Sequence, residues 1–176
     1  MRPPVDRQRI EQLARGLGEA APVHTVVYLT GGATAVLEGW RESTIDVDLR
    51  IEPKSDELMR ELVKLKEQLA INIEVTSPPD FIPELPGWRE RSPLVLEVAN
   101  LEVRTFDLYS QALAKIERGF RQDLTDVQSM LDSGGVNANR LEDVYEQIEP
   151  EMYRYPAIEP VAFRAKLRAA LQDATA

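Results

Sequence analysis

Cysteine is missing from this 176-residue chain, histidine occurs once, and no apolar run approaches the length of a membrane span. Without cysteine there is no disulfide, no thiolate nucleophile and no cysteine-bound zinc. With His24 alone, a histidine zinc site or a Ser-His-Asp triad is not expected either. The first residues lead into a polar helical pattern rather than a signal sequence, so we expect a cytoplasmic protein without a membrane partner.

Positively charged residues are also fewer than negatively charged ones. The chain has 21 lysines and arginines against 30 aspartates and glutamates, a formal net charge of −9. Extended nucleic-acid backbones would be repelled by this excess, so no extended DNA binding is expected. A small triphosphate needs only a local positive pocket and arrives with its own metal ion, so the charge still permits a nucleotide enzyme.

The apolar periodicity predicts an α/β (α+β) fold, a mixed sheet flanked by helices and followed by a helical C-terminal half. Strands are expected at 23–29, 45–51, 71–75, 94–98 and 101–106. Helices are expected at 6–19, 33–38, 55–69, 108–118, 124–131, 140–148 and 161–171. This pattern divides the chain into an α/β core at 1–106 and a helical part at 107–176 packed on it.

A proline-rich loop, residues 77–93, interrupts the predicted core. A loop of this length without regular structure is uncommon in a compact domain, and one frequent reason is that it borders a binding site. An ordered cover over one end of the sheet explains it equally well.

A glycine pair and two aspartates carry the clearest sign of chemistry. Gly31 and Gly32 follow one predicted strand, and Asp46 and Asp48 lie two residues apart on the next, so their carboxylates share a face. Such neighbouring charges repel unless a cation lies between them, and Mg²⁺ or Mn²⁺ favours oxygen ligands. Glycine lets backbone N–H groups approach phosphate closely. Taken singly, the glycine pair is commonly a tight turn and the aspartates a solvated face; their order and separation favour a nucleotide site.

These residues resemble a known signature. Gly31-Gly32, a short helix and Asp46-Val47-Asp48-Leu49 are similar to the glycine-pair and twin-acid motif of the DNA polymerase β-like nucleotidyltransferase superfamily. Residues 112–119 and 123–127 resemble a second block of its minimal bacterial branch, which includes abortive-infection and toxin–antitoxin nucleotidyltransferases. The resemblance to one bacterial nucleotidyltransferase-like family extends over almost the whole chain.

The resemblance implies a metal site of three carboxylates. Asp46 and Asp48 would hold Mg²⁺ together with a third acid on a following strand, and Glu74 is the best match in this sequence. The family more often has aspartate at that position. These three residues are the predicted catalytic and metal-binding set.

Nucleotide contacts are expected at Gly31, Gly32 and Thr44. The glycines would cradle the phosphates. Thr44 flanks the metal-binding strand, and it either reaches phosphate or stabilises the turn before that strand.

The second block adds two cations. Lys115 and Arg118 lie three residues apart on one predicted helix face, where both are expected to meet the triphosphate. The resemblance implies this contact for the lysine. A solvated helix face is the ordinary alternative for both. Asp123 precedes the next predicted helix, where we interpret it first as an N-cap that orients Lys115 only indirectly.

The predicted function is Mg²⁺-dependent transfer of a nucleoside monophosphate from an NTP to a hydroxyl. The acceptor could be a tRNA end, a protein side chain or a small molecule, and a toxin–antitoxin or defence system would add a cognate partner protein. The alternative is a non-catalytic nucleotide-binding or protein-interaction module that retains the fold.

Overall fold

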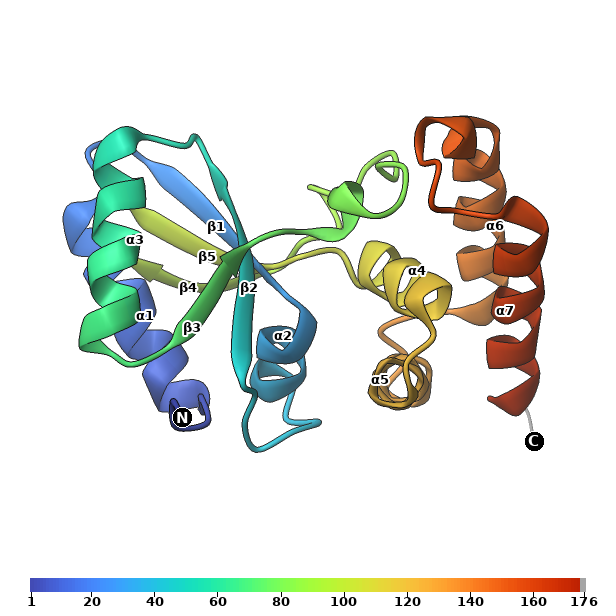
Figure 1. The fold of residues 1–176 in the computed structure, drawn as a ribbon, viewed down its shortest axis with the longest axis horizontal. Helices are drawn as coiled ribbons and strands as arrows, with labels where there is room; N and C mark the ends of the chain where they lie inside the picture. Colours follow the sequence, from blue (N-terminus) through green and yellow to red (C-terminus); the bar gives the residue numbers. More distant parts are fainter. Residues whose placement is uncertain (175–176) are drawn as a thin grey trace. The chain divides into compact units, whose positions relative to one another are not determined.

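Two compact units make up residues 1–174, the part of the chain that the computed structural model describes (Figure 1). The first, here called the sheet unit, comprises Met1–Ser77 and Ser92–Phe106. The second, the helical unit, comprises Pro78–Arg91 and the residues from Asp107 onward. The sequence predicted a single boundary after residue 106, whereas residues 78–91 of the proline-rich loop group with the C-terminal helices.

The sheet unit contains a mixed five-stranded sheet of order β3-β2-β1-β5-β4, which confirms the predicted α/β class. Its strands are β1 (Thr25–Thr30), β2 (Asp46–Glu52), β3 (Asn72–Val75), β4 (Leu94–Val98) and β5 (Leu101–Thr105). Its helices are α1 (Arg7–Ala20), α2 (Gly31–Leu37) and α3 (Asp56–Gln68). β1 pairs with β2 and β4 with β5 in antiparallel fashion, and the other two pairings are parallel.

One face of this sheet forms the core of the sheet unit. Buried and half-buried residues alternate along β2, so its apolar side chains share that face. α1 and α3 pack on it through their apolar stripes. The cluster includes Ile10, Leu13, Leu17, Val27, Leu29, Val47, Leu49, Ile51, Leu58, Leu62, Leu65 and Val103. The opposite face of β2 and β3 is left to polar side chains, and the predicted carboxylates lie there.

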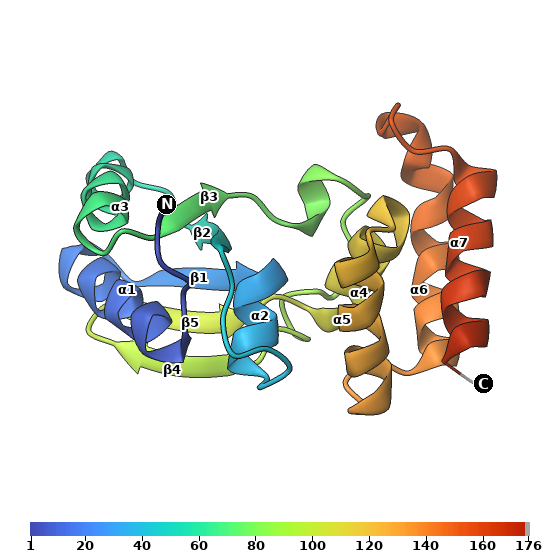
Figure 2. The same ribbon diagram turned by 60° about the horizontal axis from the view of Figure 1, so that its bottom comes forward.

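The helical unit is built around α4 (Leu108–Arg118), which contacts α5 (Arg121–Asp132), α6 (Ala138–Ile148) and α7 (Pro160–Asp173). Two short 3₁₀ helices, η1 (Pro78–Asp80) and η2 (Glu149–Arg154), complete it. α6 and α7 run side by side (Figure 2), joined by an edge-to-face contact of Tyr145 and Phe163 with ring centroids 5.0 Å apart. None of the helices in residues 1–174 is both long and apolar enough to cross a lipid bilayer.

An ion pair between Arg91 and the buried Asp107 explains why residues 78–91 group with the helices. The Arg91 guanidinium donates to both carboxylate oxygens of Asp107, at 3.0 and 2.9 Å. Asp107 is fully buried and also caps α4, because it accepts from the amides of Tyr109 and Ser110 and from the Ser110 hydroxyl. The end of the loop is thus fixed to the start of α4.

We expect Asp107→Asn to lower the free energy of unfolding by about 2 kcal/mol, the scale of a hydrogen bond to a charged group. Asparagine still caps a helix. It is neutral, however, and has a single acceptor oxygen, so it cannot form the two charge-assisted hydrogen bonds with the Arg91 guanidinium. Urea unfolding measures the loss. Asp6→Asn is the matched control, because Asp6 caps α1 with one exposed hydrogen bond, and its stability should stay close to that of the wild type. Equal losses in the two variants would contradict the role of the Arg91 pair.

Candidate functional site

The two aspartates of β2 share the polar face of the sheet. Val47 and Leu49 are fully buried on the other face, whereas Asp46 and Asp48 are half-buried. The alternation inferred from the sequence is therefore confirmed for Val47 and Leu49, which lie beneath the pair. The same alternation predicted a buried Ile45, which precedes the strand and is 74% exposed.

β3 lies beside these aspartates in parallel register, Asp46 opposite Asn72 and Asp48 opposite Glu74. Register partners on adjacent strands project from the same face, so all four side chains emerge together. The Asn72 amide donates to Asp46 Oδ1. Glu74 is exposed.

The three carboxylates nevertheless do not converge. Among residues 1–174, no three Asp, Glu, His or Cys side chains are grouped so that they could hold a metal ion. The two aspartates have different neighbours. Asp46 is bonded to Asn72 on β3, whereas the Asp48 carboxylate lies against Gly31 at the end of β1. The predicted set of Asp46, Asp48 and Glu74 thus shares a face of the sheet without forming one three-residue metal group.

The glycine pair opens α2 instead of forming a loop before a helix at Ala33. Gly31 has φ +62°, and a Cβ there would lie 2.5 Å from Asp48 Oδ2. A Cβ on Gly32 would lie 2.1 Å from Thr44 Oγ1. Both glycines therefore make room for side chains of β2 and of the turn before it. Their contact with phosphate stays a prediction.

Gly31→Ala should cost more stability than Gly39→Ala, although both glycines have left-handed φ values, +62° and +77°. Strain from φ alone is worth about 1–2 kcal/mol in either variant. A Cβ at Gly39 meets nothing within 4 Å, whereas at Gly31 it collides with Asp48, which adds about 1–3 kcal/mol of overpacking. Urea unfolding of the two variants gives the difference. Equal losses would show that Asp48 moves aside without cost.

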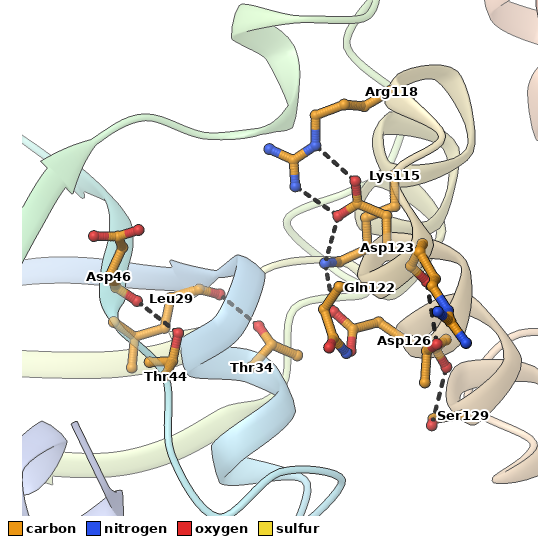
Figure 3. Close-up of polar contacts among 12 residues, drawn as sticks. Leu29, Thr34, Thr44, Asp46, Lys115, Arg118, Gln122, Asp123, Asp126 and Ser129 are labelled. Atoms are coloured by element: carbon orange, nitrogen blue, oxygen red, sulfur yellow. Dashed lines mark hydrogen bonds and ion pairs between the residues drawn. The ribbon is translucent and has the colours of Figure 1, made fainter. Parts of the chain in front are cut away.

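Thr44 stabilises the turn just before β2, which is the second of the two roles considered for it. Its hydroxyl donates to the Asp46 carbonyl at 3.1 Å (Figure 3). Its backbone forms a two-way bridge with Val5, with N···O distances of 2.7 and 2.9 Å. The N-terminal segment and the Thr44 hydroxyl together fix the backbone just before the first aspartate.

Lys115 and Arg118 belong to the helical unit and meet carboxylates there (Figure 3). Lys115 is 7% exposed, and its Nζ lies 2.7 Å from Asp126 Oδ2 and 3.5 Å from Asp123 Oδ1. Arg118 donates to both oxygens of Asp123, at 2.7 and 2.5 Å. A solvated helix face is thus the wrong description of Lys115. Contact of Lys115 and Arg118 with a triphosphate stays a prediction.

Asp123 is not the N-cap of its helix. Phe120 occupies that position, and Asp123 lies in the first turn of α5 with 2% of its surface exposed. Burial opposes its ionisation, yet the hydrogen bond from Arg118 and the charges of Lys115 and Arg118 outweigh burial and lower the pKa of Asp123 below its usual value. Asp123 therefore contacts Lys115 directly, as a buried anion.

Two residues with direct contacts to the predicted site residues, Asn72 and Asp126, were not identified as such from the sequence. Asn72 could be placed on the polar side of its strand, but its partner Asp46 depends on the pairing of β2 with β3. Asp126 follows Asp123 by three residues on α5, a spacing that puts both on one helix face. That spacing was the available signal for a second anion near Lys115.

The predicted residues are therefore divided between the two units. The sheet unit carries the acids, the glycine pair and the threonine: Gly31, Gly32, Thr44, Asp46, Asp48 and Glu74. The helical unit carries the cations, Lys115 and Arg118.

Comparison with known proteins gives one match. Residues 8–166 match the family described as "Nucleotidyltransferase of unknown function (DUF6036)". No curated protein and no solved structure matches the chain. The match confirms a nucleotidyltransferase-like family, and the relation to bacterial toxin–antitoxin enzymes stays a prediction. Because the matched residues span most of the sequence and include both units, the chain belongs to the DUF6036 family of nucleotidyltransferases of unknown function.

Proposed function

We propose that the protein transfers a nucleoside monophosphate from an NTP to a hydroxyl group, with Mg²⁺ or Mn²⁺ held by Asp46 and Asp48. The observation that carries the proposal is the pair of half-buried carboxylates on one face of β2, with Asp48 lying against a glycine that leaves room for it. The family match supports the general reaction class.

The donor chemistry of this face suits a hard divalent ion. Mg²⁺ is commonly bound by one or two carboxylates, and water and substrate phosphate oxygens complete its coordination. Asp46 and Asp48 can supply that number. Because Glu74 does not join them in a three-residue group, we assign Glu74 no ligand role in the proposal.

The reaction forms one bond and breaks one. The acceptor hydroxyl oxygen attacks the α-phosphorus, the bond from that phosphorus to the oxygen of the leaving group breaks, and pyrophosphate departs. A bound divalent ion would supply charge neutralisation on the phosphate oxygens. We assign the hydroxyl proton to Glu74, the exposed carboxylate beside Asp48 in register. Positioning of the two substrates, rather than covalent catalysis, would account for the rate.

Each of the other predicted nucleotide-binding residues also has a second role or partner. Gly31 and Gly32 have a packing role, and a phosphate role would be additional to it. Contact of Lys115 and Arg118 with a triphosphate stays a prediction, and each of the two already has a carboxylate partner. A toxin–antitoxin setting and a cognate partner protein also stay predictions.

Label transfer tests the proposal. Purified protein is incubated with each α-labelled NTP and Mg²⁺, together with separated fractions of total RNA, total protein and small metabolites. We expect one fraction to take up label in the presence of Mg²⁺ and to lose that uptake with EDTA or with Asp46→Asn. Nucleotide binding without any transfer would favour the non-catalytic nucleotide-binding module, and absence of both would contradict the proposal.

A further inference from the structure

The two aspartates of β2 have opposite kinds of neighbour on β3. Asp46 lies opposite Asn72, whose amide donates to its Oδ1, whereas Asp48 lies opposite Glu74, a carboxylate that as an anion has no proton to donate. β3 is the edge strand of the five-stranded sheet, so no further strand of the sheet lies beyond Asn72 and Glu74.

Asp46 lies at the start of its strand. It is the first residue of β2 and follows Ile45, which is 74% exposed. Asp48 lies further along the strand, where its carboxylate packs against Gly31. The backbone of Asp46 is held by the Thr44 hydroxyl, and its side chain is held by the Asn72 amide.

We propose that Asn72 is a positioning residue for Asp46, which holds Oδ1 so that Oδ2 is presented to the divalent ion. This inference rests on the proposed function. An amide suits the task because it donates a hydrogen bond at every working pH and adds no charge to a face that already carries three carboxylates. The donor also restricts rotation of the carboxylate before the ion arrives, which lowers the entropy cost of binding.

Outer-shell donors of this kind typically change metal affinity by about 10–100-fold. A donor with a purely structural role would instead affect the stability of the metal-free protein and leave metal affinity unchanged. The two roles are therefore separable by measuring both quantities.

The test is titration calorimetry with Mn²⁺ alone, without nucleotide, together with thermal unfolding of the metal-free protein. For Asn72→Ala we expect the Mn²⁺ dissociation constant to rise about tenfold. Asn72→Gln, which keeps an amide donor, should recover part of the affinity. The matched control is Asn100→Ala, since the Asn100 amide also donates one hydrogen bond within the sheet unit, to the Ala21 carbonyl at 3.1 Å. It should leave Mn²⁺ affinity unchanged.

Asp46→Asn separates this inference from the proposed function. Wild-type Mn²⁺ affinity in Asn72→Ala, together with lost binding in Asp46→Asn, would overturn the role of Asn72 and leave the metal site standing. If Asp46→Asn binds Mn²⁺ normally, the metal site and the positioning role both fail. If the wild-type protein binds no Mn²⁺ in the absence of nucleotide, the positioning role fails.

Discussion

Asp48→Asn is expected to reduce nucleotidyl transfer by at least about 100-fold while leaving the protein folded. Loss of one preorganised electrostatic group at a reacting phosphate typically costs on the order of 10²–10³ in rate. The substitution keeps the shape of the side chain beside Gly31 and removes a charge next to Asp46 and Glu74. Relief of like-charge repulsion should therefore leave the free energy of unfolding unchanged or slightly raised.

Steady-state label transfer and urea unfolding measure the two parts of this prediction. Glu52→Gln is the matched control, since it makes the same chemical change on the same face of β2, where Glu52 pairs with Arg50. It should retain wild-type turnover. A normal rate in Asp48→Asn, or an equal loss in Glu52→Gln, would exclude Asp48 from the chemistry.

Lys115→Ala is expected to lower the free energy of unfolding by about 3–5 kcal/mol, the cost of removing one partner from a buried ion pair. Asp123 and Asp126 are each 2% exposed, and both face the Lys115 ammonium in the wild type. Arg118 still neutralises Asp123 in the variant, whereas Asp126 loses its 2.7 Å cation. Urea unfolding at neutral pH measures the loss.

The pH dependence identifies the cause. In the wild type the pKa of Asp123 is lowered, so its contribution to stability is present above the unfolded pKa and is lost as the pH falls through the folded pKa. In the variant a buried carboxylate without its cation favours the protonated form, so stability should recover as the pH falls towards the unfolded pKa.

Lys64→Ala is the control for the lysine substitution, since the Lys64 side chain is 64% exposed and pairs with Glu61 on the same helix. It should leave stability nearly unchanged and independent of pH, as for exposed ion pairs in general. Similar effects of Lys115→Ala and Lys64→Ala would mean that the charges around Asp126 are solvated.

The sequence predicted those features that depend only on residues close together in the chain. The alternation of Val47 and Leu49 with the two aspartates fixed the face of β2, because side chains of a strand alternate whatever the strand pairs with. Gly119 likewise marked the end of α4, where its left-handed φ of +72° stops the helix.

What the sequence left open depends on contacts between distant residues. The glycine pair was placed before a helix that begins at Ala33, whereas α2 begins at Gly31, and the surroundings of the pair are set by Asp48 and Thr44. The grouping of residues 78–91 with the helices follows from the bonds of Arg91 to Asp107 and of Tyr155 to Pro79, which have no local signature.

The pairing and register of the strands were also not predicted from the sequence. Glu74 was placed correctly on the polar side of its strand, but the register that brings it beside Asp48, and Asn72 beside Asp46, is visible only in the folded sheet. α5 begins at Arg121 without a side-chain cap, so the composition around Asp123 suggested a helix start that lies three residues too late.

Calorimetric titration of the wild-type protein and the Asp46→Asn/Asp48→Asn double variant with ATP, GTP, CTP and UTP, each with and without Mg²⁺, tests the metal-dependent site most directly. We predict that at least one nucleotide binds to the wild type only in the presence of Mg²⁺ and that the double variant loses this binding. Nucleotide binding that needs no metal, or that persists unchanged in the double variant, would contradict the assignment of these aspartates.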